Sequence, residues 1–228
     1  MEIPFSWVIF IGIALVSYLV QLNLQSKFKK YTKIPLSNGM TGRDVAMQML
    51  RDNGINDVQV THTPGMLTDH YNPANKTVNL SEAVYAGNSI MAAAVAAHEC
   101  GHAVQHARVY VPLAMRSKLV PIVTFASQWM TWLLLGGILL INTFPQLLLA
   151  GIILFATTTL FSFITLPVEI DASRRALVWL STSGISNMYN HKQAEDALRS
   201  AAYTYVVAAL GSLATLVYYI MIFLGRRN

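Results

Sequence analysis

Charged residues are scarce in this chain. Its 228 residues include only 12% Asp, Glu, Lys and Arg, which is about half the share found in ordinary soluble domains. Hydrophobic residues make up 54% of the sequence, and three stretches contain no charged residue at all: 3–26, 119–168 and 200–225. This composition indicates a membrane protein. It leaves no room for a large soluble module beside several spans.

Cysteine is also nearly absent, because Cys100 is the only one in the chain. An intrachain disulfide is therefore excluded, which fits a protein whose site lies in a reducing compartment. The chain contains neither an internal repeat nor a low-complexity segment. We expect a single membrane-embedded domain over residues 1–228.

The uncharged stretches predict about four membrane-spanning helices. A span needs about 20 apolar residues, so the first and last stretches hold one span each and the middle stretch holds two. Asn142 and Pro145 mark the turn between the middle pair, since Asn and Pro interrupt helices. The first span is long and is followed by basic residues, so we expect a retained anchor rather than a cleaved signal peptide. The predicted spans are 4–24, 119–141, 146–167 and 201–224.

Lysine and arginine are concentrated in two segments. Of the 16 in the chain, 14 lie within 27–118 and 169–199. Basic residues beside spans stay in the cytosol, and four spans place both segments on one side. We therefore expect a multi-pass protein of the cell membrane with cytosolic catalytic segments and both termini outside. The net charge of +5 then reflects contact with the lipid bilayer, and no nucleic-acid partner is expected.

The charged segments contain signals for short helices and strands. Thr41 and Asp44 have the spacing of a capping box, and Ser89 can cap a second helix rich in alanine, a strong helix former. Runs of β-branched residues bounded by turn residues indicate strands. The predicted elements are helices over 41–53 and 90–107 and strands over 58–61 and 77–80.

The helix over 90–107 carries the run His98-Glu99-Cys100-Gly101-His102. Residues four apart on a helix lie about 40° apart on one face, so His98 and His102 can bind one zinc ion. Glu99 lies beside that face, where it can take a proton from a water activated by the zinc. These are the mechanics of the H-E-x-x-H motif of zinc peptidases. Cys100 points away from the ligand face and is expected to be a packing residue.

A catalytic zinc site needs a third protein ligand and an open position for water. Glu169 is the strongest candidate because it is the first charged residue after 50 uncharged ones, where the third span ends. Asp171 is the next candidate, either as the ligand or as a group that orients one. His191 is also a candidate for binding the oxyanion. The competing histidines for the third ligand are His62, His70, His106 and His191.

Three runs of the sequence stand out in combination: Leu67-Thr68-Asp69-His70-Tyr71, 95–105 around the histidine pair, and 167–176 around Glu169. They resemble the YugP-type neutral zinc metallopeptidases of bacterial membranes, and the likeness extends over nearly the whole chain. More distantly, the third run is similar to the HtpX and CAAX-processing gluzincin peptidases, in which a Glu ligand is followed by x-x-Ala-Asp-Arg-x-Ala. Ser173 stands where that pattern has Asp, which leaves Asp171 as the candidate supporting carboxylate.

The resemblance implies a mainly α integral membrane protein with a zincin-like catalytic core and a small β-hairpin or edge strand. It implies one Zn²⁺ per chain, with Glu169 as the third ligand. It also implies a strand beside the active-site helix that pairs with the substrate, for which the candidate residues are Thr77, Val78, Asn79 and Leu80. The expected function is a zinc-dependent endopeptidase that hydrolyses polypeptides, including membrane proteins, at the cytosolic membrane face.

Two other functions stay open. A site-2-type intramembrane protease also combines H-E-x-x-H with a distant carboxylate, but it uses an Asp-Gly pair that this sequence lacks. Its motif would also lie in a span, and the uncharged stretch 83–97 is too short for one. A non-catalytic membrane scaffold would keep zinc for structure, which usually requires a fourth Cys or His ligand. Glu99 favours catalysis over that alternative.

Overall fold

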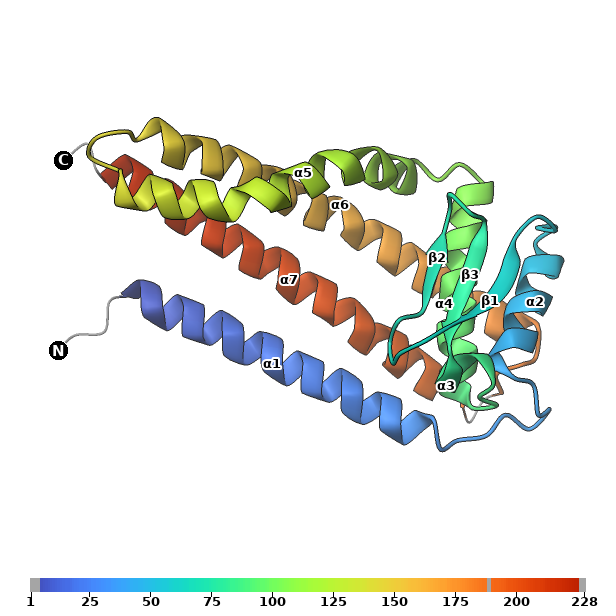
Figure 1. Cartoon of the computed structure of the whole chain (residues 1–228). Coiled ribbons are helices and arrows are strands. Elements are labelled where there is room, and N and C mark those ends of the chain that lie inside the picture. The colour runs from blue at the N-terminus through green and yellow to red at the C-terminus, as the bar shows by residue number, and fades with distance from the viewer. Residues whose placement is uncertain (1–4, 188–189, 226–228) are drawn as a thin grey trace. The chain divides into compact units, whose positions relative to one another are not determined.

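The structure is a computed structural model that describes residues 5–187 and 190–225 (Figure 1). As expected, the chain is mainly helical and carries a small sheet. Its helices are α1 (Phe5–Tyr31), α2 (Gly42–Asp52), α3 (Glu82–Tyr85), α4 (Ile90–Ala107), α5 (Val111–Leu139), α6 (Gln146–Thr182) and α7 (His191–Gly225). Its strands are β1 (Gln59–Thr63), β2 (His70–Asn72) and β3 (Thr77–Ser81).

The chain divides into two compact units. The first unit combines the chain up to Leu19 with Ala114–Leu166 and the chain from Thr204 onward. The second unit combines Val20–Leu113 with Pro167–Tyr203. The second unit therefore corresponds closely to the two charged segments predicted from the sequence, and it contains the candidate metal ligands.

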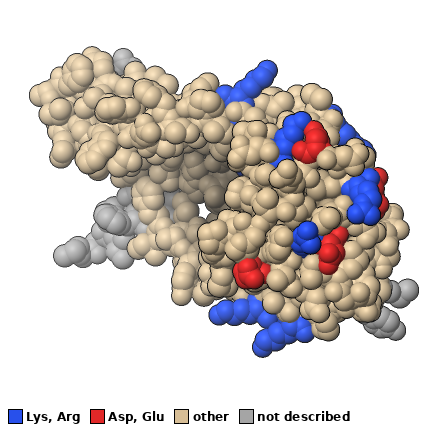
Figure 2. Space-filling model, turned by 45° about the vertical axis from the view of Figure 1, so that its right-hand side comes forward, with Lys and Arg blue, Asp and Glu red and all other residues tan. Residues whose placement is uncertain are grey.

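Within residues 5–187 and 190–225, three helices are long and apolar enough to cross a membrane, namely α5, α6 and α7. All three are longer than the spans predicted from the uncharged stretches, because their charged ends continue as further helical turns. Large apolar side chains of the first unit are exposed: Trp132 is 70% and Ile153 is 58% accessible. Broad areas of the face seen in Figure 2 carry no charged side chain, as suits contact with lipid.

Helices α5 and α6 form a tight hairpin in the first unit. The turn lies at the predicted place, since α5 ends at Leu139 and α6 begins at Gln146. The two helices approach closely at glycines: a Cβ on Gly151 would lie 2.9 Å from the backbone nitrogen of Leu134. Small residues that let two backbones approach are typical of helix packing in membranes.

The sheet of the second unit has the strand order β1-β3-β2. β1 pairs with β3 in parallel, β2 pairs with β3 antiparallel, and Thr77 has partners on both sides. The prediction that Thr77–Leu80 is an open edge strand for substrate is therefore wrong, because β3 is the central strand and its residues 77–79 have partners on both sides. The sequence did not reveal β2, since three residues followed by a turn give too short a pattern.

Both predicted helices of the charged segments are confirmed. The Thr41 side chain accepts a bond from the backbone of Asp44, whose carboxylate binds the Thr41 backbone in return, so the capping box is complete. Ser89 caps α4 by accepting a bond from the Ala92 backbone, 3.2 Å away. α4 packs against α2 through small buried side chains (Figure 1). Its alanines thus allow the motif helix to lie deep in the second unit.

Cys100 lies on the side of α4 that faces α2. Its side chain is fully buried, and Sγ lies 3.6 Å from the carbonyl oxygen of Ala46 on α2. This burial raises the pKa of the Cys100 thiol. The expectation that Cys100 packs in the core rather than binding the metal is therefore confirmed.

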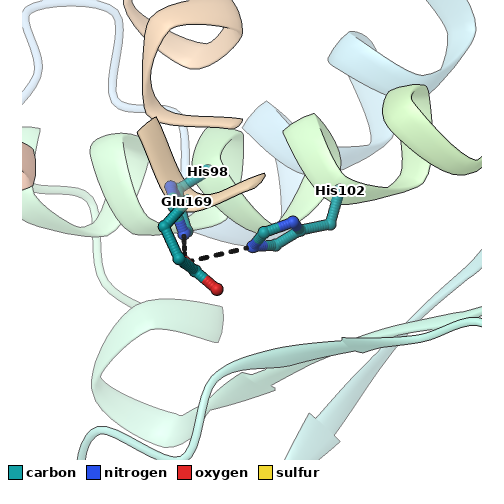
Figure 3. A group of neighbouring side chains, drawn as sticks. All are labelled: His98, His102 and Glu169. Carbon is teal, nitrogen blue, oxygen red and sulfur yellow. Dashed lines mark ion pairs between the residues drawn. The ribbon is translucent and has the colours of Figure 1, made fainter. Parts of the chain in front are cut away.

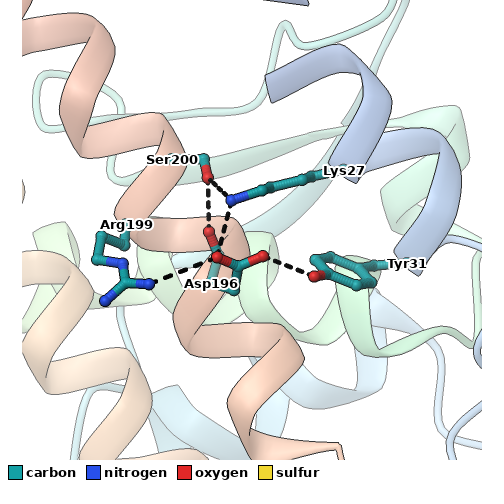
Figure 4. A network of polar contacts seen from close by, with 5 residues as sticks. All are labelled: Lys27, Tyr31, Asp196, Arg199 and Ser200. Atoms are coloured by element: carbon teal, nitrogen blue, oxygen red, sulfur yellow. Dashed lines mark hydrogen bonds and ion pairs between the residues drawn. The ribbon is translucent and has the colours of Figure 1, made fainter. Parts of the chain in front are cut away.

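A polar cluster joins α1 to α7 inside the second unit (Figure 4). Lys27 Nζ lies 2.7 Å from Asp196 Oδ1 and also donates to Ser200 Oγ. Tyr31 donates its hydroxyl hydrogen to the other oxygen of Asp196, 2.6 Å away. Arg199 reaches the same carboxylate at 3.6 Å. Asp196 therefore anchors the end of α1 beside the start of α7.

Candidate metal centre

Three side chains from two helices meet at one point in the second unit (Figure 3). His98 and His102 project from α4, and Glu169 projects from α6. Glu169 Oε2 lies 3.3 Å from His98 Nε2 and 3.5 Å from His102 Nε2. Each of the three offers an atom to this group within 4.8 Å of the other two. The structure thus brings together the three residues predicted as metal ligands.

A glycine within the motif permits this meeting. A Cβ on Gly101 would lie 2.6 Å from the carbonyl oxygen of Ala172 on α6, well inside van der Waals contact. With glycine at this position, α4 and α6 can approach closely enough for Glu169 to reach both imidazoles. No role for Gly101 was predicted from the sequence, although its small size between the two histidine ligands is visible there.

Gln105 holds one of the two histidines. Its Nε2 donates to the Val168 carbonyl and to Asp171 Oδ2, both at 2.8 Å. These two acceptors fix the amide so that Oε1 faces His102 Nδ1, 3.1 Å away. Since Oε1 can only accept, Nδ1 of His102 must donate. The other nitrogen, Nε2, then keeps its lone pair on the side of Glu169, as a metal ligand requires.

Ser173 contacts the other histidine. Ser173 Oγ lies 3.0 Å from His98 Nδ1, and a hydroxyl oxygen can accept the Nδ1 hydrogen. Ser173 therefore makes the orienting contact at the place where the gluzincin-like pattern has Asp. Asp171 does not replace that carboxylate at His98. It acts on His102 instead, through Gln105, while also accepting a bond from Arg175.

Glu99 lies on α4 beside the ligands and is buried, with 8% of its surface accessible. Its charge and that of Glu169 act on His102. Burial alone would lower the pKa of His102, but the bond to Glu169 and the two carboxylate charges outweigh burial and raise it. The site is therefore electrostatically negative and favours a bound cation.

The other candidate histidines have partners outside this group. Among the described residues, one group of at least three potential ligands could hold a metal. That group contains none of the four other candidate histidines. An oxyanion role for His191 accordingly stays a prediction without a supporting contact. The partners are Glu82 for His62, the Thr68 carbonyl for His70, Tyr71 for His106 and Ser186 for His191.

Two imidazoles and one carboxylate are the ligand set of many catalytic zinc sites, which keep a fourth position for water. His102 and Glu169 are buried and His98 is partly exposed. The residues present fit a zinc ion in number, chemistry and orientation.

Comparison with known proteins agrees with this geometry. The family described as "Putative neutral zinc metallopeptidase" matches residues 6–224. The chain belongs to this family. It is also 44% identical over 212 residues, 93% of each chain, to the "Putative membrane protease YugP" of Bacillus subtilis (strain 168). No solved structure matches the chain. The family resemblance seen in the sequence is thereby confirmed.

Proposed function

We propose that this protein is a zinc-dependent membrane endopeptidase that binds one Zn²⁺ through His98, His102 and Glu169. The observation that carries the proposal is the convergence of these side chains, with His102 Nε2 directed at the shared point by Gln105. Membership of a zinc metallopeptidase family supports it. An intact Glu99 beside the ligands supports catalysis rather than a structural role for the metal.

Zinc held at this point would polarise the scissile carbonyl and make the attacking water more acidic. Glu99 accepts the proton that this water loses and then delivers it to the nitrogen of the leaving amine. Gln105 and Ser173 keep the two imidazoles in the orientation that the reaction needs. Glu169 adds a negative charge that balances the metal.

The strand β2 is our candidate for pairing with the substrate, in place of β3. Among the described strands it pairs only with β3. It lies beside α4, since the Tyr71 hydroxyl is 2.7 Å from His106 Nδ1, one turn beyond His102. An extended polypeptide can add to such an edge through main-chain hydrogen bonds. An unfolded segment of a membrane protein is extended and can pair with β2 in this way. Such segments are therefore suitable substrates for an enzyme with a zincin-like core.

We further propose that α1 is a fourth span and that both charged segments are cytosolic. Within the first unit, Phe10 of α1 packs edge-on against Tyr218 of α7, with ring centroids 4.9 Å apart. A Cβ on Gly211 would lie 2.9 Å from Ile13 Cγ2, so α1 lies close to a candidate span. The distribution of basic residues supports the cytosolic side.

The proposal can be tested with the full chain purified in detergent. Zinc content is measured by mass spectrometry, and cleavage of a peptide mixture is followed before and after treatment with a chelator. We expect about one zinc per chain, loss of cleavage after chelation and recovery when zinc is returned. Cleavage by the zinc-free chain would contradict the proposal. Bound zinc without any cleavage would favour the scaffold alternative.

A further inference from the structure

A polar cavity lies in the second unit, on the side of α4 that faces α2. It has a volume of about 450 Å³ and is bounded by the end of α2, the end of α4 and the part of α6 beyond Val168. This volume falls in the range of about 300–1,000 Å³ that is typical of small-molecule sites. Its polar lining residues are Asn53, Arg108, Asp171, Arg174, Arg175, Trp179 and Thr182.

The charged lining residues are three arginines and one aspartate, Asp171, so the lining carries a net charge of +2. Of the three arginines, Arg175 is engaged with Asp171 and lies over the ring of Tyr110. Arg108 has a single long contact, 3.4 Å to Asn53 Oδ1. In the part of the chain that the structure describes, neither Arg108 nor Arg174 forms an ion pair. Two guanidinium groups at the cavity are thus available to an anion.

A neighbouring carboxylate, that of Asp52, reduces the positive charge around the cavity by one. Asp52 lies outside the lining and accepts a hydrogen bond from Trp179 Nε1, 3.0 Å away. That bond restrains Trp179, which lines the cavity together with the apolar side chains of Met49 and Val104. The cavity therefore combines arginine donors with a fixed aromatic wall and an apolar wall.

We propose that this cavity binds a phosphate group. Guanidinium groups donate paired hydrogen bonds that match phosphate oxygens, and arginine is favoured wherever phosphate is bound in this way. Arg174 supplies donors from α6, and Arg108 supplies them from the position that follows α4. The Asn53 amide donates one hydrogen to the Met49 carbonyl and has a second one to offer. The cavity is distinct from the metal centre, because its lining includes none of His98, Glu99, His102 or Glu169. The two share Asp171, which lines the cavity and also accepts a bond from Gln105, the residue that orients His102.

The phosphate can come from a lipid headgroup or from a soluble phosphate. Arg174 follows the last residue of the uncharged stretch, Val168, by six positions, which is about 9 Å along a helix. If α6 spans the bilayer, this places the arginine close to the headgroup layer, and its long side chain can reach back towards it. Both sources share the chemistry that the cavity recognises, so the experiment must separate them.

The test uses the full chain freed of lipid in a nonionic detergent, and the same chain in nanodiscs. Inorganic phosphate is titrated against the detergent sample, with binding followed by the shift in melting temperature. In the second arm, native mass spectrometry measures retention of phosphatidylglycerol, with phosphatidylcholine as the comparison lipid. The test variant is Arg108→Gln/Arg174→Gln. The matched control is Arg43→Gln/Arg51→Gln, which removes the same charge from exposed positions of α2.

We expect the unmodified chain and the control to bind in at least one arm, and the test variant to bind at least about tenfold more weakly, because charge-assisted hydrogen bonds are lost. Binding of inorganic phosphate would assign a soluble phosphate. Retention of phosphatidylglycerol without binding of inorganic phosphate would assign a lipid headgroup. Equal binding by the test variant, or no binding in either arm, would overturn the proposal. If the double variant does not fold, Arg174→Gln alone serves, since that side chain is exposed.

Discussion

Gln105 Oε1 lies 3.1 Å from Nδ1 of His102, and this contact decides which nitrogen of the imidazole faces the candidate metal position. The amide cannot turn round without cost, because its Nε2 already donates to the Val168 carbonyl and to Asp171. A reversed amide would place an oxygen against two acceptors. The network thus prepares His102 for metal binding before the metal arrives.

Replacing Gln105 by leucine should weaken zinc binding. The change keeps a similar volume but removes the acceptor for His102 Nδ1, so the ring loses its fixed tautomer. Loss of such an orienting partner typically costs about 10–100-fold in affinity or activity. Zinc affinity can be measured by competition with a chelator. Gln59→Leu on the exposed face of β1 is the control and should bind zinc normally; equal affinities of the two variants would contradict a role for Gln105.

Gly101→Ala should disturb the site from within the motif. The added Cβ would lie 2.6 Å from the Ala172 carbonyl oxygen, so α6 must move away from α4 and carry Glu169 with it. Overpacking of this kind costs about 1–3 kcal/mol. We expect a lower melting temperature and reduced zinc content. Gly12→Ala, where a Cβ meets nothing within 4 Å, should change neither; a Gly101→Ala chain with full zinc would show that the close approach is unnecessary.

The two carboxylates of α6 should respond differently to mutation. Glu169 lies 3.3 Å and 3.5 Å from the two imidazoles, so Glu169→Ala should purify nearly free of zinc. Asp171 reaches His102 only through Gln105, so Asp171→Ala should keep zinc with reduced activity. Metal analysis of both purified variants decides between them. The reverse result would transfer the ligand role to Asp171 and revive the site-2-type alternative.

The proposed topology predicts that Lys30, Arg108 and Lys192 face the cytosol. Cysteine placed at each position should stay unlabelled when a membrane-impermeant thiol reagent is added to intact cells, and should react after lysis. Cysteine at Phe144, which is exposed in the turn between α5 and α6, should be labelled from outside. Native Cys100 is buried and should add little background. Labelling at 192 but not at 30 would rule out four spans.

The metal ligands could be predicted from the sequence because their signals are local. Helical spacing places His98 and His102 on one face, and Glu169 stands out after a long uncharged stretch. The positions of the strands in the sheet could not be predicted, since strand order depends on contacts between distant segments. Thr77–Leu80 looked like an edge strand but is central.

The residues that position the ligands were harder to recognise. Gln105 lies three residues after His102 and therefore near the same helical face, a signal that was present but unspecific. Its function depends on Val168 and Asp171, more than sixty residues away. Ser173 likewise meets His98 only because α6 packs on α4. Such roles arise from tertiary packing between helices. The sequence of a single chain does not show which residues of two distant helices will come into contact.

The most direct test of zinc-dependent catalysis is a paired measurement on Glu99→Gln. Zinc content and peptide cleavage are determined on the same preparation, beside the unmodified chain. Glu99 is outside the ligand group, so the variant should keep its zinc. Without the carboxylate, the proton transfer is lost, which should slow cleavage by about 10²–10⁴-fold. Full zinc with this loss of cleavage is the predicted result; full zinc with undiminished cleavage would contradict Glu99 as the catalytic base.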